Sequence, residues 1–222
     1  MNYFIDFEAT QFSNDIISIG CIDENGEEVD GDQIMAISAL ALKKSGKLTN
    51  NTLVGTVMSN LGLVKFCEAN DIDFVATKVG DRYVLEKMLE CDYIIGGEQS
   101  GHVIFKDFAN TGDGELTSIQ ILNILSDAGI SMSEAASVMK KYPQVLINVK
   151  VREEAKGQYE NDQQVTDVIC EVEKELAGEG RVLIRPSGTE ALIRVMIEGL
   201  EQEDINKKAK RNADVIKKKF GV

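Results

Sequence analysis

A short segment between two apolar stretches gathers residue types that can hold a phosphate. Arg185 offers a fork of guanidinium donors, and Ser187 and Thr189 offer hydroxyl groups. Gly188 lets the backbone turn so that its N–H groups converge on one concavity. Arg194 follows on the next apolar stretch and adds positive charge. The pattern predicts an anion site, although Pro, Ser and Gly between two strands are also ordinary hairpin residues.

A second set of polar side chains lies in the glycine-rich segment Gly96–His102. Glu98 can accept hydrogen bonds from two adjacent sugar hydroxyls, and Ser100 can donate to a hydroxyl or a phosphate. The glycines, Gly101 among them, permit a sugar ring to approach the backbone closely. His102 is the only histidine, and an ordering role in the loop is favoured over a chemical one. A sugar site and a plain glycine-rich turn stay open as alternatives.

Two carboxylates near the N-terminus have strand spacing. Asp6 and Glu8 lie on one face of a strand, because side chains alternate with a period of two. Carboxylates in that arrangement can share metal ions. A pair of solvated residues on an edge strand is nevertheless favoured over a working metal site.

The elements that must position these residues follow from turn signals and apolar periodicity. Strands are predicted at 2–8 and 15–22, and Asp23-Glu24-Asn25-Gly26 predicts a tight hairpin turn. Strands and helices then alternate, which is typical of an α/β domain with a largely parallel sheet. The expected strands are 53–58, 74–79, 93–96 and 103–108, and the expected helices are 34–42, 60–69, 81–90, 114–126 and 133–141.

Pro143 interrupts this rhythm. The remainder predicts strands at 144–151, 181–184 and 192–197, a polar linker or long loop at 152–161, and helices at 162–177 and 204–220. The expected fold is therefore an α/β domain with a mixed, largely parallel sheet, followed by a small α+β domain with an antiparallel sheet. A β-hairpin segment precedes both. The expected divisions are 1–30, 31–147 and 148–222.

Composition narrows the function classes. The chain has 222 residues, 43% hydrophobic and 27% charged, which is ordinary for a globular protein. Its formal net charge of -13 argues against nucleic-acid binding and requires a local cationic pocket for any anionic ligand. The four cysteines have no metal-ligand spacing, so reduced thiols are expected. No apolar run is long enough for a membrane span and no basic leader is present, so a cytoplasmic location is expected.

Together, the two loops resemble the α-D-phosphohexomutase superfamily, and within it the phosphoglucosamine mutases. They read Gly97-Glu98-Gln99-Ser100-Gly101-His102 and Arg185-Pro186-Ser187-Gly188-Thr189-Glu190. The resemblance runs from about residue 22 to the C-terminal end. Further matching stretches, in family order, are Asp30-Gly31-Asp32-Gln33-Ile34-Met35, Thr56-Val57-Met58-Ser59-Asn60-Leu61-Gly62, Val79-Gly80-Asp81-Arg82-Tyr83-Val84 and Thr111-Gly112-Asp113-Gly114.

The resemblance implies a transfer of a phosphoryl group between the 6- and 1-positions of a hexose, here glucosamine, by way of a phosphoserine. It implies that the Glu98/Ser100 loop holds sugar hydroxyls. It also implies that Arg185, Ser187, Gly188 and Thr189 clamp the phosphate that is not transferred. Lys78 and Arg82 are further candidates to face the same cleft.

Departures from the family pattern qualify this expectation. Ala191 stands where the family has proline, which matters little for anion binding. The phosphoserine domain and the Asp-rich Mg²⁺ loop of the family have no counterpart in these residues, so the chain alone is expected to be inactive and to bind no metal. Asp30 and Asp32 are interpreted as helix caps rather than Mg²⁺ ligands.

The first 20 residues do not resemble a phosphohexomutase. Tyr3–Thr10 resembles the first strand of a DEDD-type 3′–5′ exonuclease, in which an Asp-x-Glu pair corresponding to Asp6 and Glu8 binds two metals. A fusion or a remnant is inferred there. Three readings therefore stand: a partial mutase, a non-catalytic sugar-phosphate-binding module, and an exonuclease-like protein. The expected partners are a hexosamine phosphate and either further N-terminal domains or a second copy of the chain, with no nucleic acid and no membrane.

Overall fold

The computed structural model describes the backbone of residues 4–9, 16–188 and 190–222, and the side chains from residue 20 onward except that of 189. The chain divides into two compact units, Met1–Lys141 and Tyr142–Val222. The N-terminal hairpin expected as a separate segment belongs to the first unit. The division expected near residue 148 falls inside a strand of the second unit, so the observed division lies a few residues earlier.

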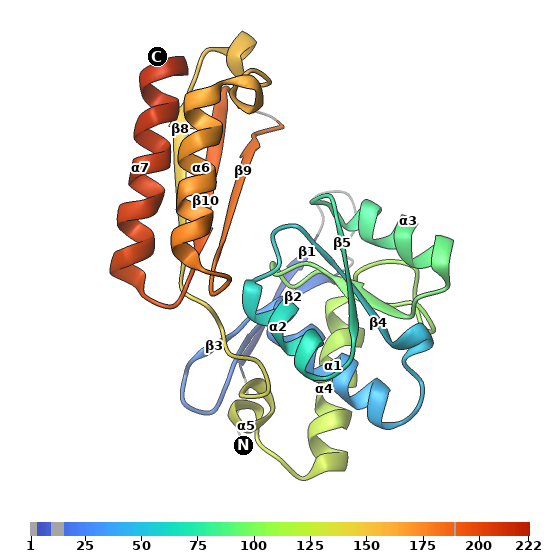
Figure 1. Cartoon of the computed structure of the whole chain (residues 1–222). Coiled ribbons are helices and arrows are strands. Elements are labelled where there is room, and N and C mark those ends of the chain that lie inside the picture. Colours follow the sequence, from blue (N-terminus) through green and yellow to red (C-terminus); the bar gives the residue numbers. More distant parts are fainter. Residues whose placement is uncertain (1–3, 10–15, 189) are drawn as a thin grey trace. The chain divides into compact units, whose positions relative to one another are not determined.

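A four-stranded mixed sheet forms the centre of the first unit (Figure 1). Its order is β5 (Asp73–Thr77), β4 (Thr52–Thr56), β6 (Ile95–Gly97) and β7 (Val103–Phe105). Strand β4 runs parallel to β5 and β6, and β7 is antiparallel to β6. The α/β class and the mixed sheet predicted from the sequence are confirmed.

Helices cover both faces of this sheet because its strand residues alternate between two apolar clusters. Leu53 belongs to the cluster on the side of α1 and α2, whereas the next residue, Val54, packs with Val84 and Met88 of α3. The helices of the unit are α1 (Gly31–Lys44), α2 (Leu61–Ala69), α3 (Asp81–Cys91), α4 (Gly114–Ala128) and α5 (Met132–Ala136). None of the helices among the described residues is long and apolar enough to cross a membrane.

Helix α5 is shorter than predicted. The sequence predicted a helix to residue 141, but α5 ends at Ala136, with Ser137 as its C-cap. The hydroxyl of Ser137 donates to the carbonyl of Glu134 at 2.7 Å, so a local side-chain bond competes with helix continuation. The following turn brings the carbonyl of Lys140 against Gly62, where a side chain would not fit.

A second, three-stranded antiparallel sheet contains β1 (Phe4–Ala9), β2 (Ile16–Ile22) and β3 (Glu28–Val29), with β1 at an edge. The predicted hairpin turn is present between β2 and β3, but it is a five-residue connection rather than a tight two-residue turn. Asp23 explains the wider loop, because its Oδ1 accepts from the backbone N–H groups of Asn25 at 2.8 Å and Glu27 at 2.9 Å. Gly26 supplies the positive φ of 83°.

The turn of this hairpin also caps α5. The carboxylate of Glu24 accepts from the backbone N–H of Ser133 at 3.2 Å and from its hydroxyl. The hydrogen bond from the Ser133 side chain has the largest effect on the pKa of Glu24, and an interaction with the Ser131 side chain comes second. Together they lower this pKa to about 2. A side chain from a distant turn therefore satisfies donors at a helix N-terminus.

The second unit is a three-stranded antiparallel sheet with two helices packed on it (Figure 1). The strand order is β8 (Gln144–Lys150), β10 (Leu192–Glu198) and β9 (Arg181–Pro186), which confirms the predicted α+β architecture. Helix α7 (Gln202–Phe220) packs against β8 and β10, and α6 (Gln163–Leu176) packs against α7 and β9.

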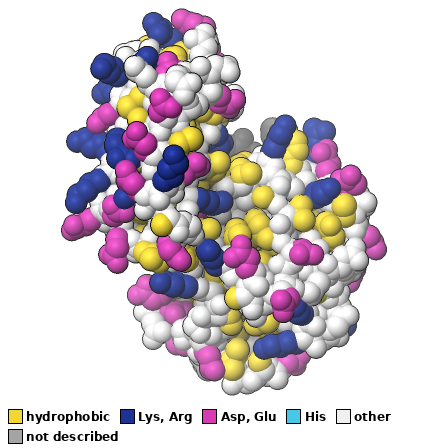
Figure 2. All heavy atoms as spheres, in the orientation of Figure 1, with side chains coloured by type: hydrophobic (Ala, Val, Ile, Leu, Met, Phe, Trp, Pro, Cys, Tyr) yellow, Lys and Arg dark blue, Asp and Glu magenta, His cyan; other side chains and the backbone are white. Residues whose placement is uncertain are grey.

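Acidic and basic side chains are mixed on the face shown in Figure 2, without one continuous basic patch.

The segment 152–161, predicted as a linker or a long loop, packs into the second unit. It forms two single-turn 3₁₀ helices, Glu153–Ala155 and Tyr159–Asn161. Ala155 and Tyr159 are buried in the cluster beneath α7. The hydroxyl of Tyr159 donates to the carbonyl of Ile184 at 3.0 Å, so of the two alternatives the packed loop is the one observed.

A buried ion pair closes the end of the second sheet away from the β9–β10 loop. Glu198 is fully buried and pairs with Nε of Arg181, which lies opposite it on β9. A buried carboxylate requires such a partner because desolvation of an unpaired charge is costly.

The Glu24 contact gives a pH-dependent contribution to stability. The pKa of Glu24 is lowered in the folded state. The stabilising contribution of the ionised Glu24 side chain is therefore fully present at a pH above the ordinary carboxyl pKa, and it is lost as the pH falls toward about 2. We expect Glu24→Gln to lower the melting temperature at pH 7 and to have a shrinking effect as the pH falls below about 4. Thermal unfolding of Glu24→Gln and of the exposed control Glu27→Gln across the acidic and neutral range measures this. Equal effects of the two variants at neutral pH would contradict the cap.

Loss of one partner of the Arg181–Glu198 pair leaves the other charge buried. We expect Glu198→Ala to lower the free energy of unfolding by about 3–5 kcal/mol. Urea unfolding followed by circular dichroism measures the change. Glu171 is exposed on α6 and has no ion pair among the described residues, so Glu171→Ala is the control. A loss for Glu198→Ala no larger than that of the control would refute a structural role for the pair.

Candidate functional site

The loop between β6 and β7 is closed by backbone hydrogen bonds. The N–H of Glu98 donates to the carbonyl of His102, and the N–H of Gly101 donates to the carbonyl of Glu98, both at 3.0 Å. Gly101 has a φ of 97°, a conformation that side chains with a Cβ rarely adopt. The loop is thus a defined hairpin that presents the side chains of Glu98 and Ser100.

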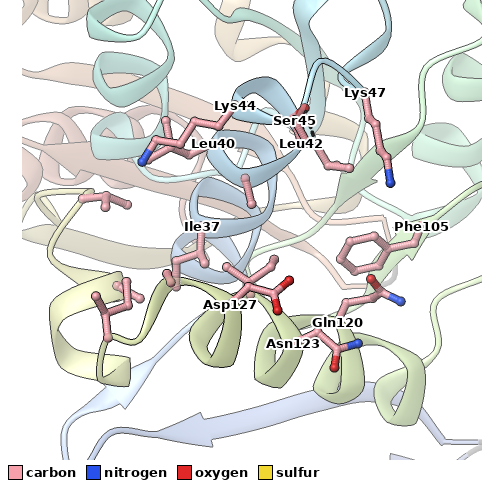
Figure 3. A pocket seen from close by; sticks show the side chains of 16 residues that line it. Ile37, Leu40, Leu42, Lys44, Ser45, Lys47, Phe105, Gln120, Asn123 and Asp127 are labelled. Carbon is pink, nitrogen blue, oxygen red and sulfur yellow. Dashed lines mark hydrogen bonds between the residues drawn. The ribbon is translucent and has the colours of Figure 1, made fainter.

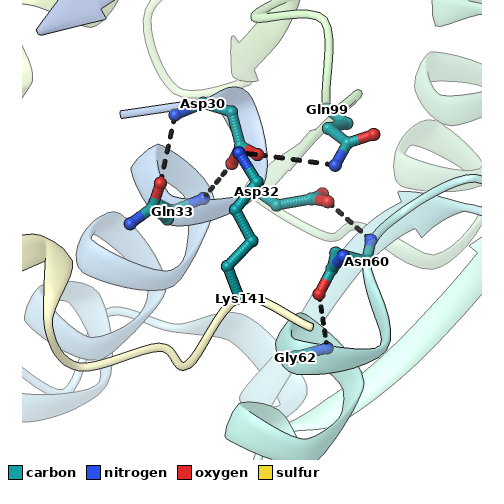
Figure 4. Close-up of polar contacts among 7 residues, drawn as sticks. All are labelled: Asp30, Asp32, Gln33, Asn60, Gly62, Gln99 and Lys141. Carbon is teal, nitrogen blue, oxygen red and sulfur yellow. Dashed lines mark hydrogen bonds and ion pairs between the residues drawn. The ribbon is translucent and has the colours of Figure 1, made fainter. Parts of the chain in front are cut away.

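This loop rests on the N-terminus of α1 (Figure 4). The N–H of Gly31 donates to the carbonyl of Gln99 at 2.9 Å, and the Gln99 amide donates to Asp30 Oδ2 at 3.4 Å. A Cβ on Gly31 would overlap the carbonyl of Glu98 and approach the amide nitrogen of Gly101 to 2.8 Å. Glycine at this position therefore permits the contact between helix and loop.

Asp30 is the N-cap of α1, as predicted. It forms a capping box with Gln33, and its Oδ2 pairs with Lys141 Nζ at 2.7 Å (Figure 4). Asp32 is buried, and its Oδ2 accepts from the N–H of Asn60 at 2.6 Å, so it supports the N-terminus of α2 rather than capping α1. No group of three or more potential metal-binding side chains occurs in the part of the chain whose side chains are described.

The carboxylate of Glu98 connects the loop to the segment between β5 and α3. Its Oε1 accepts from the N–H of Gly80 at 2.9 Å. Gly80 has a φ of 127°, which only glycine adopts readily, so a glycine at this position sets the direction of the donor. One carboxylate oxygen is thereby held in place, and the predicted role of Glu98 as an acceptor of sugar hydroxyls stays a prediction.

Ser100 and His102 form a polar pair at the tip of the loop. The Ser100 hydroxyl lies 3.3 Å from Nδ1 of His102, and the serine is exposed. This geometry is consistent with the ordering role predicted for His102. A ligand role for either side chain stays a prediction.

The two predicted cationic candidates beyond β5 differ in their surroundings. Lys78 is exposed, with its Nζ 5.9 Å from the centroid of the Tyr83 ring. Arg82 Nε pairs with Glu86 at 2.8 Å on the outer surface of α3, and this hydrogen bond raises the pKa of Arg82. Lys78 is therefore available to a ligand, whereas Arg82 already has an acidic partner.

The loop between β9 and β10 is the second candidate site. The N–H of Ser187 donates to the carbonyl of Leu192 at 2.9 Å, and the buried Ser187 hydroxyl accepts from the N–H of Glu190 at 3.3 Å. Gly188 is exposed, and a Cβ at this position would have no described atom within 4 Å. Thr189 lies outside the described residues, so its predicted role stays a prediction.

Two arginines flank this loop on neighbouring strands. Arg185 on β9 lies directly opposite Arg194 on β10, which places both side chains on one face of the sheet. The Nε of each is buried without a hydrogen-bond partner among the described residues. Burial, followed by the charge of Arg194, lowers the pKa of Arg185. Glu190 Oε2 forms an ion pair with Arg194 at 3.9 Å, too long for a hydrogen bond, so the two neighbouring guanidinium groups have one distant acidic partner.

The two candidate loops lie in different units, and each geometry stands by itself. That they share one ligand therefore remains a prediction. Sequence reasoning did not identify Gly80 as the residue that donates a hydrogen bond to Glu98. A glycine immediately before the acidic start of a predicted helix was the available signal, but its contact with Glu98 depends on the tertiary fold.

A cavity of about 710 Å³ also lies in the first unit, between the C-terminal parts of α1 and α4 (Figure 3). Its lining is mainly apolar, with Lys44, Lys47 and Asp127 among the charged residues. Among the described residues, none from either candidate loop lines it. Sequence patterns offered no signal for this cavity, because its lining comes from separate elements that only the tertiary fold brings together.

Comparison with protein families identifies two parts of the chain with known domains. Residues 30–142 match Phosphoglucomutase/phosphomannomutase, alpha/beta/alpha domain III, and residues 146–215 match the C-terminal domain of the same family. The chain belongs to the phosphoglucomutase/phosphomannomutase family, the phosphohexomutases. It is 53% identical over 210 residues to a phosphoglucosamine mutase of Acetivibrio thermocellus, covering 95% of the chain and 47% of that protein.

Other relatives give the same picture. A phosphoglucosamine mutase of Caldicellulosiruptor bescii is 54% identical over 199 residues, which is 90% of the chain and 44% of that protein. The chain thus spans about half the length of the curated relatives it matches. Among solved structures, the Aspergillus fumigatus N-acetylphosphoglucosamine mutase in complex with GlcNAc-6P and magnesium superposes with a TM-score of 0.73 at 18% identity. The match covers 91% of this chain and 50% of that one, which shows a shared fold.

The match also bears on the N-terminal segment. Because it covers 95% of the chain, it extends upstream of residue 22, where the resemblance was expected to begin. The backbone of Asp6 and Glu8 forms part of β1, but their side chains lie outside the described residues. The metal-binding alternative for this pair therefore stays untested by the structure.

The contact between α1 and the β6–β7 loop can be tested at Gly31. We expect Gly31→Ala to destabilise the first unit by about 1–3 kcal/mol, since the added methyl group meets backbone atoms of the loop. Gly157 has open space around its Cβ position and no positive φ, so Gly157→Ala is the matched control. Urea unfolding gives the energies, and amide chemical shifts of residues 98–102 report the loop. Unchanged loop shifts in Gly31→Ala would show that the close approach is not required.

Proposed function

We propose that this chain forms the sugar-binding and phosphate-binding part of a cytoplasmic phosphoglucosamine mutase, which interconverts glucosamine 6-phosphate and glucosamine 1-phosphate. The similarity to phosphoglucosamine mutases supports the choice of sugar. The observation that carries the proposal is the pair Arg185 and Arg194, whose buried Nε atoms lack partners among the described residues. Two adjacent guanidinium groups held in this way are complementary to a phosphate dianion.

Each loop has a distinct role in this proposal. Glu98 accepts hydrogen bonds from sugar hydroxyls, supported by Ser100, Gly101 and His102. Arg185, Arg194 and the loop residues Ser187, Gly188 and Thr189 hold the phosphate that is not being transferred. Because the enzyme must grip a phosphate at either end of the sugar, a non-covalent cradle suits this loop better than a nucleophile.

The chemical step needs groups that these loops do not offer. A phosphoryl transfer requires a nucleophile and charge neutralisation. The Aspergillus fumigatus N-acetylphosphoglucosamine mutase was solved in complex with GlcNAc-6P and magnesium. We propose that the two loops of this chain bind hexosamine phosphate and supply neither the attacking nucleophile nor a Mg²⁺ ligand, so that the chain alone does not turn the ligand over.

Loss of the Arg185 fork tests the phosphate site. We expect Arg185→Ala to weaken binding of glucosamine 6-phosphate by about tenfold to a hundredfold, because one or two charge-assisted hydrogen bonds are lost. Isothermal titration calorimetry in the presence of EDTA measures the affinity. Lys210 is an exposed cation on α7, outside the β9–β10 loop and its two strands. The Lys210→Ala variant therefore controls for the change in net charge.

The outcomes separate the readings of function. An affinity unchanged in Arg185→Ala would overturn the assignment of the phosphate loop. Formation of glucosamine 1-phosphate by the chain alone would overturn the proposal that it is only a binding part. Binding without turnover, lost in Arg185→Ala and retained in Lys210→Ala, is the expected result.

A further inference from the structure

The cavity between α1 and α4 has the size and the lining of a small-molecule site. Its volume of about 710 Å³ lies within the range of about 300–1,000 Å³ that is usual for ligand pockets. On the α1 side, Ile37, Leu40 and Lys44 have the spacing of a single helix face. Figure 3 shows the labelled residues of α1 and those of α4 on opposite sides of the cavity, so that two helix faces border it.

The apolar part of the lining belongs to the core and yet reaches solvent. Four of its side chains pack against the core cluster of the first unit but are only partly buried, namely Leu40, Leu42, Ile124 and Ile130. Val138 also lines the cavity and is 37% exposed. Burial of these side chains against an apolar ligand is favourable, because it removes their surface from water. The lining therefore indicates a ligand with an apolar body.

The cationic side chains of the lining have no acidic partner. Lys44 and Lys47 are exposed, and neither side chain donates a hydrogen bond or forms an ion pair among the described residues. The neighbouring Lys43 differs, because its Nζ donates to the backbone carbonyl of Asp71 at 2.9 Å. The last carbonyl groups of α1 accept from backbone N–H groups, so the helix terminus does not require the two lysines. Two ammonium groups at the cavity are therefore available to an anion.

One acidic residue, Asp127 of α4, also lines the cavity. It is exposed and forms no ion pair with either lysine. The charged side chains of the lining therefore carry two positive charges and one negative charge. A lysine can lay its apolar stem along such a surface and turn its ammonium group toward a ligand. The balance favours an anionic group on the α1 side of the cavity, and Asp127 opposes it.

We propose that this cavity binds the anion of a fatty acid, with the hydrocarbon chain against Leu40 and Ile124 and the carboxylate at Lys44 and Lys47. The proposal rests on an apolar lining of sufficient volume and on cations without partners at one side of it. Every residue involved belongs to the first unit. The inference goes beyond the proposed function, since no described residue of the two candidate loops lines the cavity.

Dodecanoate is the probe, used below the concentration at which it forms micelles. Calorimetry on the full chain should show saturable binding to one site, and amide chemical shifts should change for residues 37–47 and 120–130. Decanoate is two methylene groups shorter and should bind about threefold to tenfold more weakly. Dodecyltrimethylammonium has the same hydrocarbon chain and the opposite charge, so it should bind more weakly than dodecanoate.

Charge variants test the two ammonium groups with little risk to folding, because the changed side chains of the cavity are exposed. Lys44→Gln and Lys47→Gln should each weaken dodecanoate binding about twofold to fivefold, as expected for exposed charge pairs. Asp127→Asn should strengthen it, since a nearby negative charge is removed. Lys65 on α2 is outside the lining, so Lys65→Gln is the matched control and should leave the affinity unchanged.

The opposite results would overturn the inference. Absence of saturable dodecanoate binding would do so, and tighter binding of dodecyltrimethylammonium would assign the cavity to a cationic ligand instead. Shift changes confined to residues outside the cavity would show that the probe binds elsewhere. Equal affinities in Lys44→Gln, Lys47→Gln and Lys65→Gln would refute the contact with the carboxylate. Binding of glucosamine 6-phosphate is measured separately, so either proposal can fail without the other.

Discussion

The close approach of the β6–β7 loop to the N-terminus of α1 is the contact on which the first unit's candidate site depends. Gly31 donates its N–H to Gln99, and the absence of a side chain lets the loop backbone reach the helix. Asp30 then holds both the loop and Lys141, the last residue of the unit. A helix terminus, which would otherwise leave donors unsatisfied, thereby becomes the support for a loop that presents Glu98.

In the second unit, strand pairing rather than a helix terminus positions the candidate site residues. Strand pairing places Arg185 opposite Arg194, so two cations are held together at a cost in electrostatic repulsion and in unsatisfied Nε atoms. Such local violations of otherwise consistent packing are expected at functional sites. The buried Arg181–Glu198 pair at the other end of the same two strands shows the contrasting case, in which a guanidinium group has its carboxylate within the fold.

Local patterns predicted much of this architecture, and contacts distant in sequence account for what they missed. The alternation of strands and helices, the cap at Asp30 and the hairpin at Asn25-Gly26 all follow from short-range signals. The burial of Tyr159 depends on the core beneath α7, which is formed by residues distant in sequence. Likewise, sequence reasoning found Glu98 but not Gly80, because a residue 18 positions away supplies the hydrogen bond.

The proposed function requires an acidic chain to concentrate its cations where a phosphorylated sugar would lie. With a net charge of -13, long-range attraction cannot assist, so affinity must come from a few groups whose order is established before binding. Strand pairing places Arg185 opposite Arg194. One carboxylate oxygen of Glu98 accepts from the N–H of Gly80. The proposed function assigns the phosphate to the two arginines held on paired strands of the second unit, and the sugar hydroxyl groups to a loop of the first unit that is anchored to a helix.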